Sequence, residues 1–155
     1  MANLNGSQYA QAYVTVPSSK IAPGNYNGAV RILKANYTIT AEHAANDVIL
    51  LGKLPAGAMV VDAILHVNGD IGDGTTLDLG FTANGVDSAN LDAFIDGLVT
   101  TAAAIGQMVD TATLAGIFQE FTVETTVAVD IKATLGTTDS AIGKVISAVI
   151  FYVVN

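Results

Sequence analysis

Residues 59–67 alternate between apolar and polar side chains, which is the pattern of a β-strand with one buried face. The positions predicted to face inward are Met59, Val61, Ala63, Leu65 and Val67, opposite Asp62 and His66. Residues 126–135 repeat the pattern, with the odd-numbered residues from Val127 to Leu135 inward and the polar residues between them outward. Such segments predict sheets with one face on the core and one in solvent.

Eight segments have the composition of short strands, separated by Gly, Asn, Asp and Thr. They are residues 30–40, 48–51, 59–67, 75–81, 103–108, 116–124, 126–135 and 144–154. One further segment has its apolar residues at helical spacing, after a polar N-cap. These residues are Leu91, Phe94, Ile95 and Leu98, with Ser88 or Asn90 as the cap. The sequence predicts an all-β fold, a β-sandwich or jelly-roll-like body of about eight strands with one short helix.

The first 29 residues differ from the rest of the chain. They are rich in Asn, Gln, Ser, Gly and Ala, and positive charge collects at this end: three basic residues and no acidic residue precede position 42. Residues 42–155 carry three lysines and fourteen acidic residues, a net charge of −11. We interpret residues 1–29 as an extended N-terminal arm and residues 30–155 as the β-sandwich domain.

An arm of this composition is suited to lying along the surface of another protein. Tyrosine offers a large contact area and one hydrogen-bonding group. The predicted contact residues are Tyr9, Tyr13, Lys20, Tyr26 and Arg31. The alternative is a frayed terminus that binds nothing.

The last predicted strand, residues 144–154, is apolar on both faces. Such a strand is either covered on both sides within the sandwich or in contact with another subunit, because it would otherwise promote aggregation. We favour contact with another subunit or with a larger assembly partner, and the predicted interface residues are Ile146, Ile150, Phe151 and Tyr152. A charged fraction of only 13% also favours a homo-oligomer or an obligate partner. A sandwich rich in Ala, Thr and Gly is the alternative explanation of that low charge.

Composition narrows the function further. The chain has no cysteine, which excludes disulfides, thiolate nucleophiles and Cys-ligated zinc. The longest apolar run, Val145 to Val154, is shorter than the roughly 20 residues of a membrane-spanning helix. The acidic body lacks a basic stripe, so binding to nucleic acid is not expected. The N-terminal residues do not resemble a secretory signal, and we expect synthesis in a cytoplasm.

Residues suited to catalysis are few. The chain has two histidines, His43 and His66, and no G-x-S-x-G motif, so no nucleophilic catalyst is predicted. His66 is interpreted as an ordinary surface residue. Asp70, Asp73 and Asp78 suggest a calcium loop, but they lack the alternating ligands and the terminal Glu of an EF-hand. We therefore expect turn-forming aspartates, with no catalytic residue, metal or cofactor.

Two stretches carry a resemblance to a known family. LGKLPAGAMVVDAILHVNG at residues 51–69 and GTTLDLGFTANGVDSANLDAFID at residues 74–96 resemble the decoration, or cement, proteins of tailed-bacteriophage heads. The resemblance implies a non-enzymatic structural protein on the exterior of the virion. It also implies synthesis in the host cytoplasm, with the major capsid protein as partner and stabilised contacts between capsid subunits as the result. A trimer is implied as well, whereas no active-site residue is.

A different kind of function remains open from the residues alone. A head-fibre or tail domain that binds a receptor or carbohydrate is the alternative. Its binding groups, whether for a glycan or an ion, would lie in the loops at residues 68–74 and 83–90.

Overall fold

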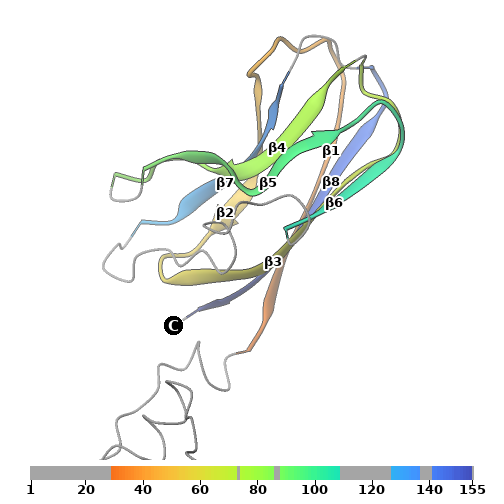
Figure 1. The fold of residues 1–155 in the computed structure, drawn as a ribbon. Helices are drawn as coiled ribbons and strands as arrows, with labels where there is room; N and C mark the ends of the chain where they lie inside the picture. The colour runs from red at the N-terminus through yellow and green to blue at the C-terminus, as the bar shows by residue number, and fades with distance from the viewer. Residues whose placement is uncertain (1–28, 73, 86–87, 109–126, 137–140, 155) are drawn as a thin grey trace, which may run out of the picture.

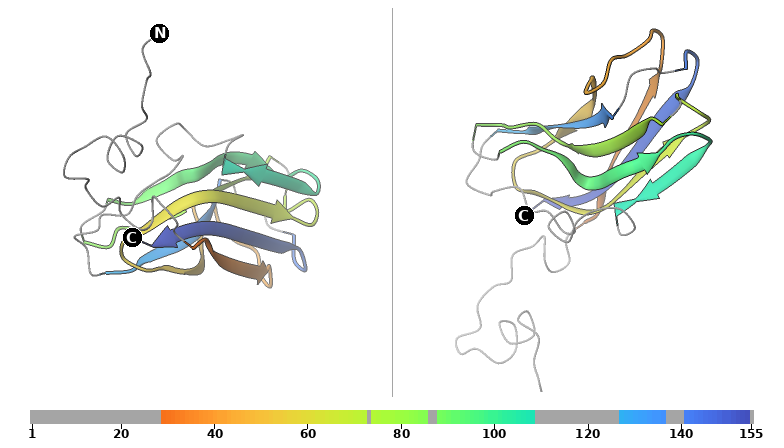
Figure 2. Two further views of the ribbon diagram at one scale, coloured as in Figure 1. Left: turned by 90° about the horizontal axis from the view of Figure 1, so that it is seen from below. Right: turned by 45° about the horizontal axis from the view of Figure 1, so that its top comes forward.

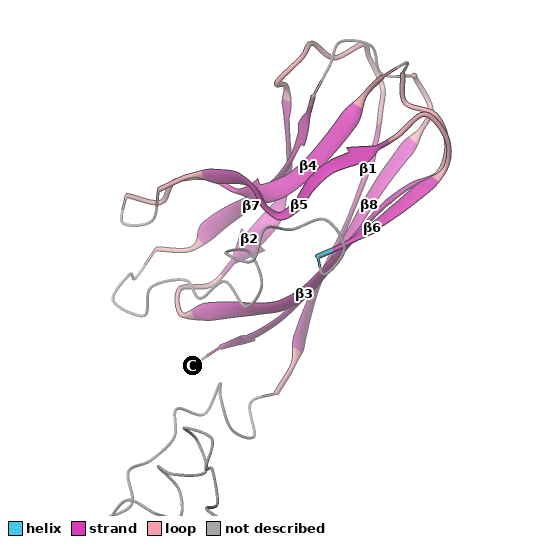
Figure 3. Cartoon of the chain, viewed as in Figure 1, coloured by secondary structure: helices cyan, strands magenta, loops and turns pink. Residues whose placement is uncertain are grey.

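The computed structural model describes residues 29–72, 74–85, 88–108, 127–136 and 141–154. These residues form eight β-strands joined by loops, and Met108 is the one described residue in helical conformation (Figures 1 and 3). The strands are β1 (Arg31–Thr38), β2 (Val48–Leu54), β3 (Ala58–Val67), β4 (Thr76–Phe81), β5 (Asn90–Val99), β6 (Ala104–Gln107), β7 (Val129–Leu135) and β8 (Val145–Val154). The expected strand at residues 116–124 and four of the five predicted arm contacts, Tyr9, Tyr13, Lys20 and Tyr26, lie outside the described residues.

The strands form two four-stranded antiparallel sheets, in the orders β1-β8-β3-β6 and β2-β7-β4-β5. Pairing is nested along the chain: β1 pairs with β8, β2 with β7, β3 with β6 and β4 with β5. This is a long hairpin rolled into two sheets, which is the topology of a jelly roll. The predicted fold class is confirmed.

The core lies between the two sheets and is filled by aliphatic side chains with two phenylalanines. Phe81 of β4 and Phe94 of β5 contact each other there, with ring centroids 6.0 Å apart at a tilt of 42°. Gly52 of β2 lets the sheets approach closely, because a Cβ at that position would lie 2.9 Å from a methyl carbon of Leu33 on β1. The side chain of Leu33 therefore packs directly against the backbone of β2.

The helix predicted near residues 90–98 is wrong, since this segment is strand β5. Its pairing with β4 is irregular: Leu77 faces Leu98 and Leu79 faces Ile95, so two residues of β4 span three of β5. Bulges of this kind add residues to one strand and disturb its alternation of two. The extra residues in β5 place the buried Phe94, Ile95 and Leu98 at helical spacing, whereas Leu91, the fourth residue of the predicted helical face, is exposed.

A bulge also explains an error in β3. The side chains predicted to face inward included Met59 and Val61, but these two are only half-buried, whereas Val60 and Ala63 are fully buried. The register of β3 against β8 shifts between Val60 and Asp62. Because of the inserted residue, side chains of β3 before the bulge point to the opposite face from the one that a regular alternation predicts.

One end of the sandwich is closed by hydrogen bonds between its loops. The backbone N–H of Ile39, after β1, donates to the carbonyl of Lys144, before β8, at 2.9 Å. The N–H of Ile71, after β3, donates to the carbonyl of Thr100, after β5, at 3.1 Å. The first residues of β1 and the last of β8 lie at the opposite end, where Figures 1 and 2 also place the C-terminus.

Candidate assembly surfaces

The four residues of β8 that were predicted to form a subunit interface do not lie together in the structure: some are in the core and others are at the surface. Ile146 and Ile150 point between the sheets and are 0% and 1% exposed, so they are core residues, a correction to their expected contact with a partner. The reason is that burial alternates along β8, and both residues lie on the inner face of the strand, which packs against the other sheet. Tyr152 packs partly against the core. Phe151 is half-buried and belongs to the other face of the strand.

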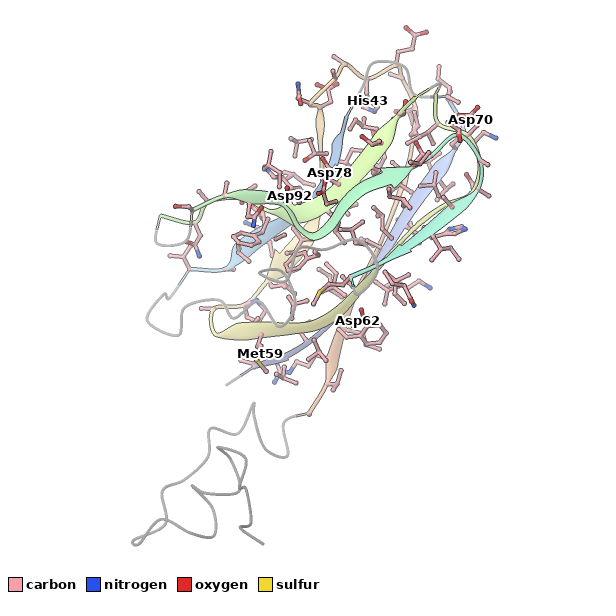
Figure 4. The ribbon with its side chains drawn as sticks, in the orientation of Figure 1. His43, Met59, Asp62, Asp70, Asp78 and Asp92 are labelled. Atoms are coloured by element: carbon pink, nitrogen blue, oxygen red, sulfur yellow. The ribbon has the colours of Figure 1, made fainter. Side chains whose placement is uncertain are left out.

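The outer face of this sheet has an apolar centre. Phe151 pairs with Ile32 of β1 on one side and with Asp62 of β3 on the other. Val149, two residues along β8, pairs with Ile64 of β3. Cross-strand neighbours on one face lie close enough to form a continuous surface. The chain therefore presents aliphatic and aromatic groups here, with the carboxylate of Asp62, labelled in Figure 4, beside them on β3.

Some of the other residues that were predicted to lie on the surface of the sheets are exposed, and others are buried. Arg31, the described member of the arm contacts, is exposed at the start of β1. His66 is half-buried on the outward face of β3, as expected. Lys132 and Thr134 of β7 were expected to face solvent, but they are 7% and 3% exposed. The Oγ1 atom of Thr134 is buried and has no hydrogen-bond partner among the described groups, an arrangement that costs folding free energy.

A cluster of acidic residues lies on β4 and β5, where Figure 4 shows Asp78 and Asp92 near each other. Asp78 Oδ1 accepts a hydrogen bond from the backbone N–H of Gly97 at 2.8 Å. Burial raises the pKa of the Asp78 carboxyl. The hydrogen bond from Gly97 opposes this shift, while the negative charges of Asp96 and Asp92 add to it. The cluster is a concentration of negative charge on one side of the sandwich.

A cluster that the sequence did not predict joins Tyr37, His43 and Asp47. The Tyr37 hydroxyl and His43 Nε2 form a hydrogen bond of 2.9 Å, and His43 Nδ1 lies 3.4 Å from Asp47 Oδ2. The same carboxylate oxygen accepts the N–H of Ala44 at 2.8 Å. Tyr37 is partly buried against the core. The cluster thus holds the β1–β2 loop against the end of β1. Its three residues are close in space only in the folded conformation of that loop.

Within the described part of the chain, no three His, Cys, Asp or Glu residues gather in a way that could hold a metal ion. Asp70 has the turn-forming role expected of it, since its Oδ1 accepts the N–H of Gly72 at 2.9 Å. Asp73 lies outside the described residues. No described segment forms an apolar helix of membrane-spanning length.

Comparison with known proteins points to phage capsids. No family model matches the sequence, and no curated protein matches it. A chain of the solved capsid of Ralstonia phage GP4 is 26% identical, with a TM-score of 0.65 over 96% of this chain and 96% of that one. A chain of the Cyanophage Pam1 capsid asymmetric unit shares the fold, at 21% identity and a TM-score of 0.54 over 92% and 98% of the two chains. These likenesses support a relation to phage capsid proteins.

Proposed function

We propose that this protein is a capsid decoration protein, which binds the outer surface of a phage head and stabilises contacts between capsid subunits. The observation that carries the proposal is the likeness to the GP4 capsid chain over 96% of both chains. A match of that extent covers the whole jelly roll, so the two chains are alike in size as well as in fold. The partner is the major capsid protein, and the site of action is the exterior of the virion.

The arrangement of the body supports attachment through several contacts at once. Residues 1–29 precede β1, and β1 begins at the end of the sandwich opposite the hydrogen-bonded loops. An arm that leaves from this end can reach a second capsid subunit while the body rests on the first. Linked contacts of this kind raise the overall affinity well above that of either contact alone. Separating two capsid subunits would then require several contacts to break together.

Co-sedimentation with capsids that lack the protein tests the proposal. We expect saturable binding at a fixed ratio to the major capsid protein, together with a higher melting temperature of the shell, because a ligand that binds only the assembled state stabilises it. A protein that remains in the supernatant at every concentration would contradict a decoration role. A glycan array would then be the next measurement, because a receptor-binding domain is the competing function.

Removal of residues 2–28 separates the contribution of the arm from that of the body. We expect the shortened protein to unfold at the temperature of the full chain but to bind capsids more weakly. The matched control is the full chain with Tyr9, Tyr13 and Tyr26 replaced by serine, which keeps the length and charge of the arm. Capsid binding equal to that of the full chain in both variants would assign attachment to the body alone.

A further inference from the structure

The two narrow sides of the sandwich are chemically different. Strands β1 and β2 are the edges of their sheets on one side, where they pack against each other, and β5 and β6 are the edges on the other. The left view of Figure 2 shows β1 and the pair β5 and β6 at opposite margins of the molecule. We call these the β1/β2 side and the β5/β6 side.

Charge is segregated between the two sides. Strands β1 and β2 contain Arg31, Lys34 and Lys53 and no acidic residue. Lys53 is paired with Asp130 of β7 at 3.0 Å, so Arg31 and Lys34 supply the net positive charge. Strand β5 contains Asp92 and Asp96 and no basic residue, and its neighbour β4 adds Asp78.

Exposed aliphatic side chains are found on both sides. On the β1/β2 side, Ile32 is 60% exposed and Leu50 is 65% exposed. On the β5/β6 side, Val99 is 58% exposed and Ile105 is 65% exposed. The strands of each side thus combine apolar groups, which favour association, with charge of one sign. The acidic residues Glu42 and Asp47 of the β1–β2 loop lie at the hydrogen-bonded end, beyond these strands.

We infer that the β1/β2 side of one copy binds the β5/β6 side of the next copy. Apolar contact supplies the affinity, and the charges select the orientation, because complementary charges across an interface mainly determine specificity. Contact between two β1/β2 sides would bring Arg31 and Lys34 against their own copies, and contact between two β5/β6 sides would oppose Asp92 and Asp96 in the same way. The resulting contact is head-to-tail, and such contacts close into rings when the rotation between copies allows it.

Charge reversal on each side, followed by its combination, tests this inference. One variant carries Arg31→Glu and Lys34→Glu, and a second carries Asp92→Lys and Asp96→Lys. Either variant has like charges on both sides, so we expect its dissociation constant to rise roughly 100-fold or more. The chain with all four substitutions has its charges exchanged and should associate again. Mass in solution is measured over a concentration series by analytical ultracentrifugation, with Glu42→Lys as a control at the hydrogen-bonded end.

Each outcome is decisive. Loss of association in both double variants with recovery in the fourfold variant supports the head-to-tail contact. A wild-type protein that stays monomeric overturns it, as does an oligomer that persists in both double variants or a fourfold variant that stays dissociated while folded. If a reversal lowers the unfolding temperature, Lys34→Gln and Asp96→Asn replace it, and each should weaken association. Capsids are absent from the experiment, so its result is independent of the proposed decoration role.

Discussion

Replacing Gly80 with alanine is expected to destabilise the sandwich by forcing β5 away from β4. A Cβ at this position would lie within 2.5 Å of the Leu91 carbonyl oxygen, and the backbone of Asn90 would also block it. These are backbone atoms of β5, which cannot move aside as the end of a long side chain does. The first residues of β5 therefore rest directly on the glycine, and a methyl group there must displace the strand.

The magnitude follows from two opposed effects. Overpacking costs about 1–3 kcal/mol, and a backbone obstacle places this substitution near the upper figure. Alanine has fewer backbone conformations than glycine in the unfolded chain, and this difference stabilises the folded state by about 0.4–1 kcal/mol. The net loss is about 2 kcal/mol, which for a chain of 155 residues lowers Tm by about 4–8 °C.

Thermal unfolding followed by circular dichroism at one fixed protein concentration measures this loss. The matched control is Gly69→Ala, whose added Cβ would meet the Nζ atom of Lys144 at 2.8 Å. That flexible side chain can turn away, so the control should unfold within about 1 kcal/mol of the wild type. If Gly80→Ala unfolded at the temperature of the control, the close approach of β5 to β4 would be refuted.

Three further substitutions test the interior and the loops. The folded protein holds the proton of Asp78 more tightly than the unfolded chain does, because burial raises its pKa. This carboxyl therefore contributes stability below the ordinary aspartate pKa and loses it as pH rises through the raised value. Asp78→Asn, whose amide oxygen can still accept the Gly97 N–H, should raise Tm at neutral pH more than at acidic pH. Tyr37→Phe removes the bond to His43 and should cost about 0.5–1.5 kcal/mol in urea unfolding; no loss would mean that the bond is not formed in solution. Ile150→Ala should cost about 2–5 kcal/mol as a core truncation, whereas weakened association with unchanged stability would return this residue to a subunit interface.

The strands were predictable from the sequence because their signal is local. An alternation of two and turn residues between segments can be recognised within about ten residues, and this placed most of the described strands within a few positions. The errors in β3 and β5 are local as well, since each lies at a bulge. Residues 90–98 imitate a helix, and Met59 was assigned to the wrong face, because an extra residue changes the period and no sequence rule marks its place.

The surfaces could not be predicted in the same way because they depend on strand order. The apolar character of Ile146 and Ile150 is evident in the sequence, but only the packing of one sheet on the other shows that they lie on the inner face of β8. The positive charge of β1 and β2 and the negative charge of β4 and β5 can also be counted from the sequence. Their separation to opposite sides requires the nested pairing of the jelly roll, which joins residues more than 100 positions apart.

The edges of the two sheets give a second reason to expect assembly on the β1/β2 side. Exposed edge strands invite pairing with other chains, and proteins protect them with bulges, short strands or charge. Strand β5 is interrupted by register shifts, β6 has four residues, and β2 has a shift at Leu50. Strand β1 pairs with β8 over eight residues without a shift, and its protection consists of Arg31 and Lys34. Positive charge repels a second β1 but attracts an acidic strand. The charges of β1 therefore disfavour symmetric pairing of two β1 strands. They favour contact between β1 and the acidic β5/β6 side of a neighbouring copy.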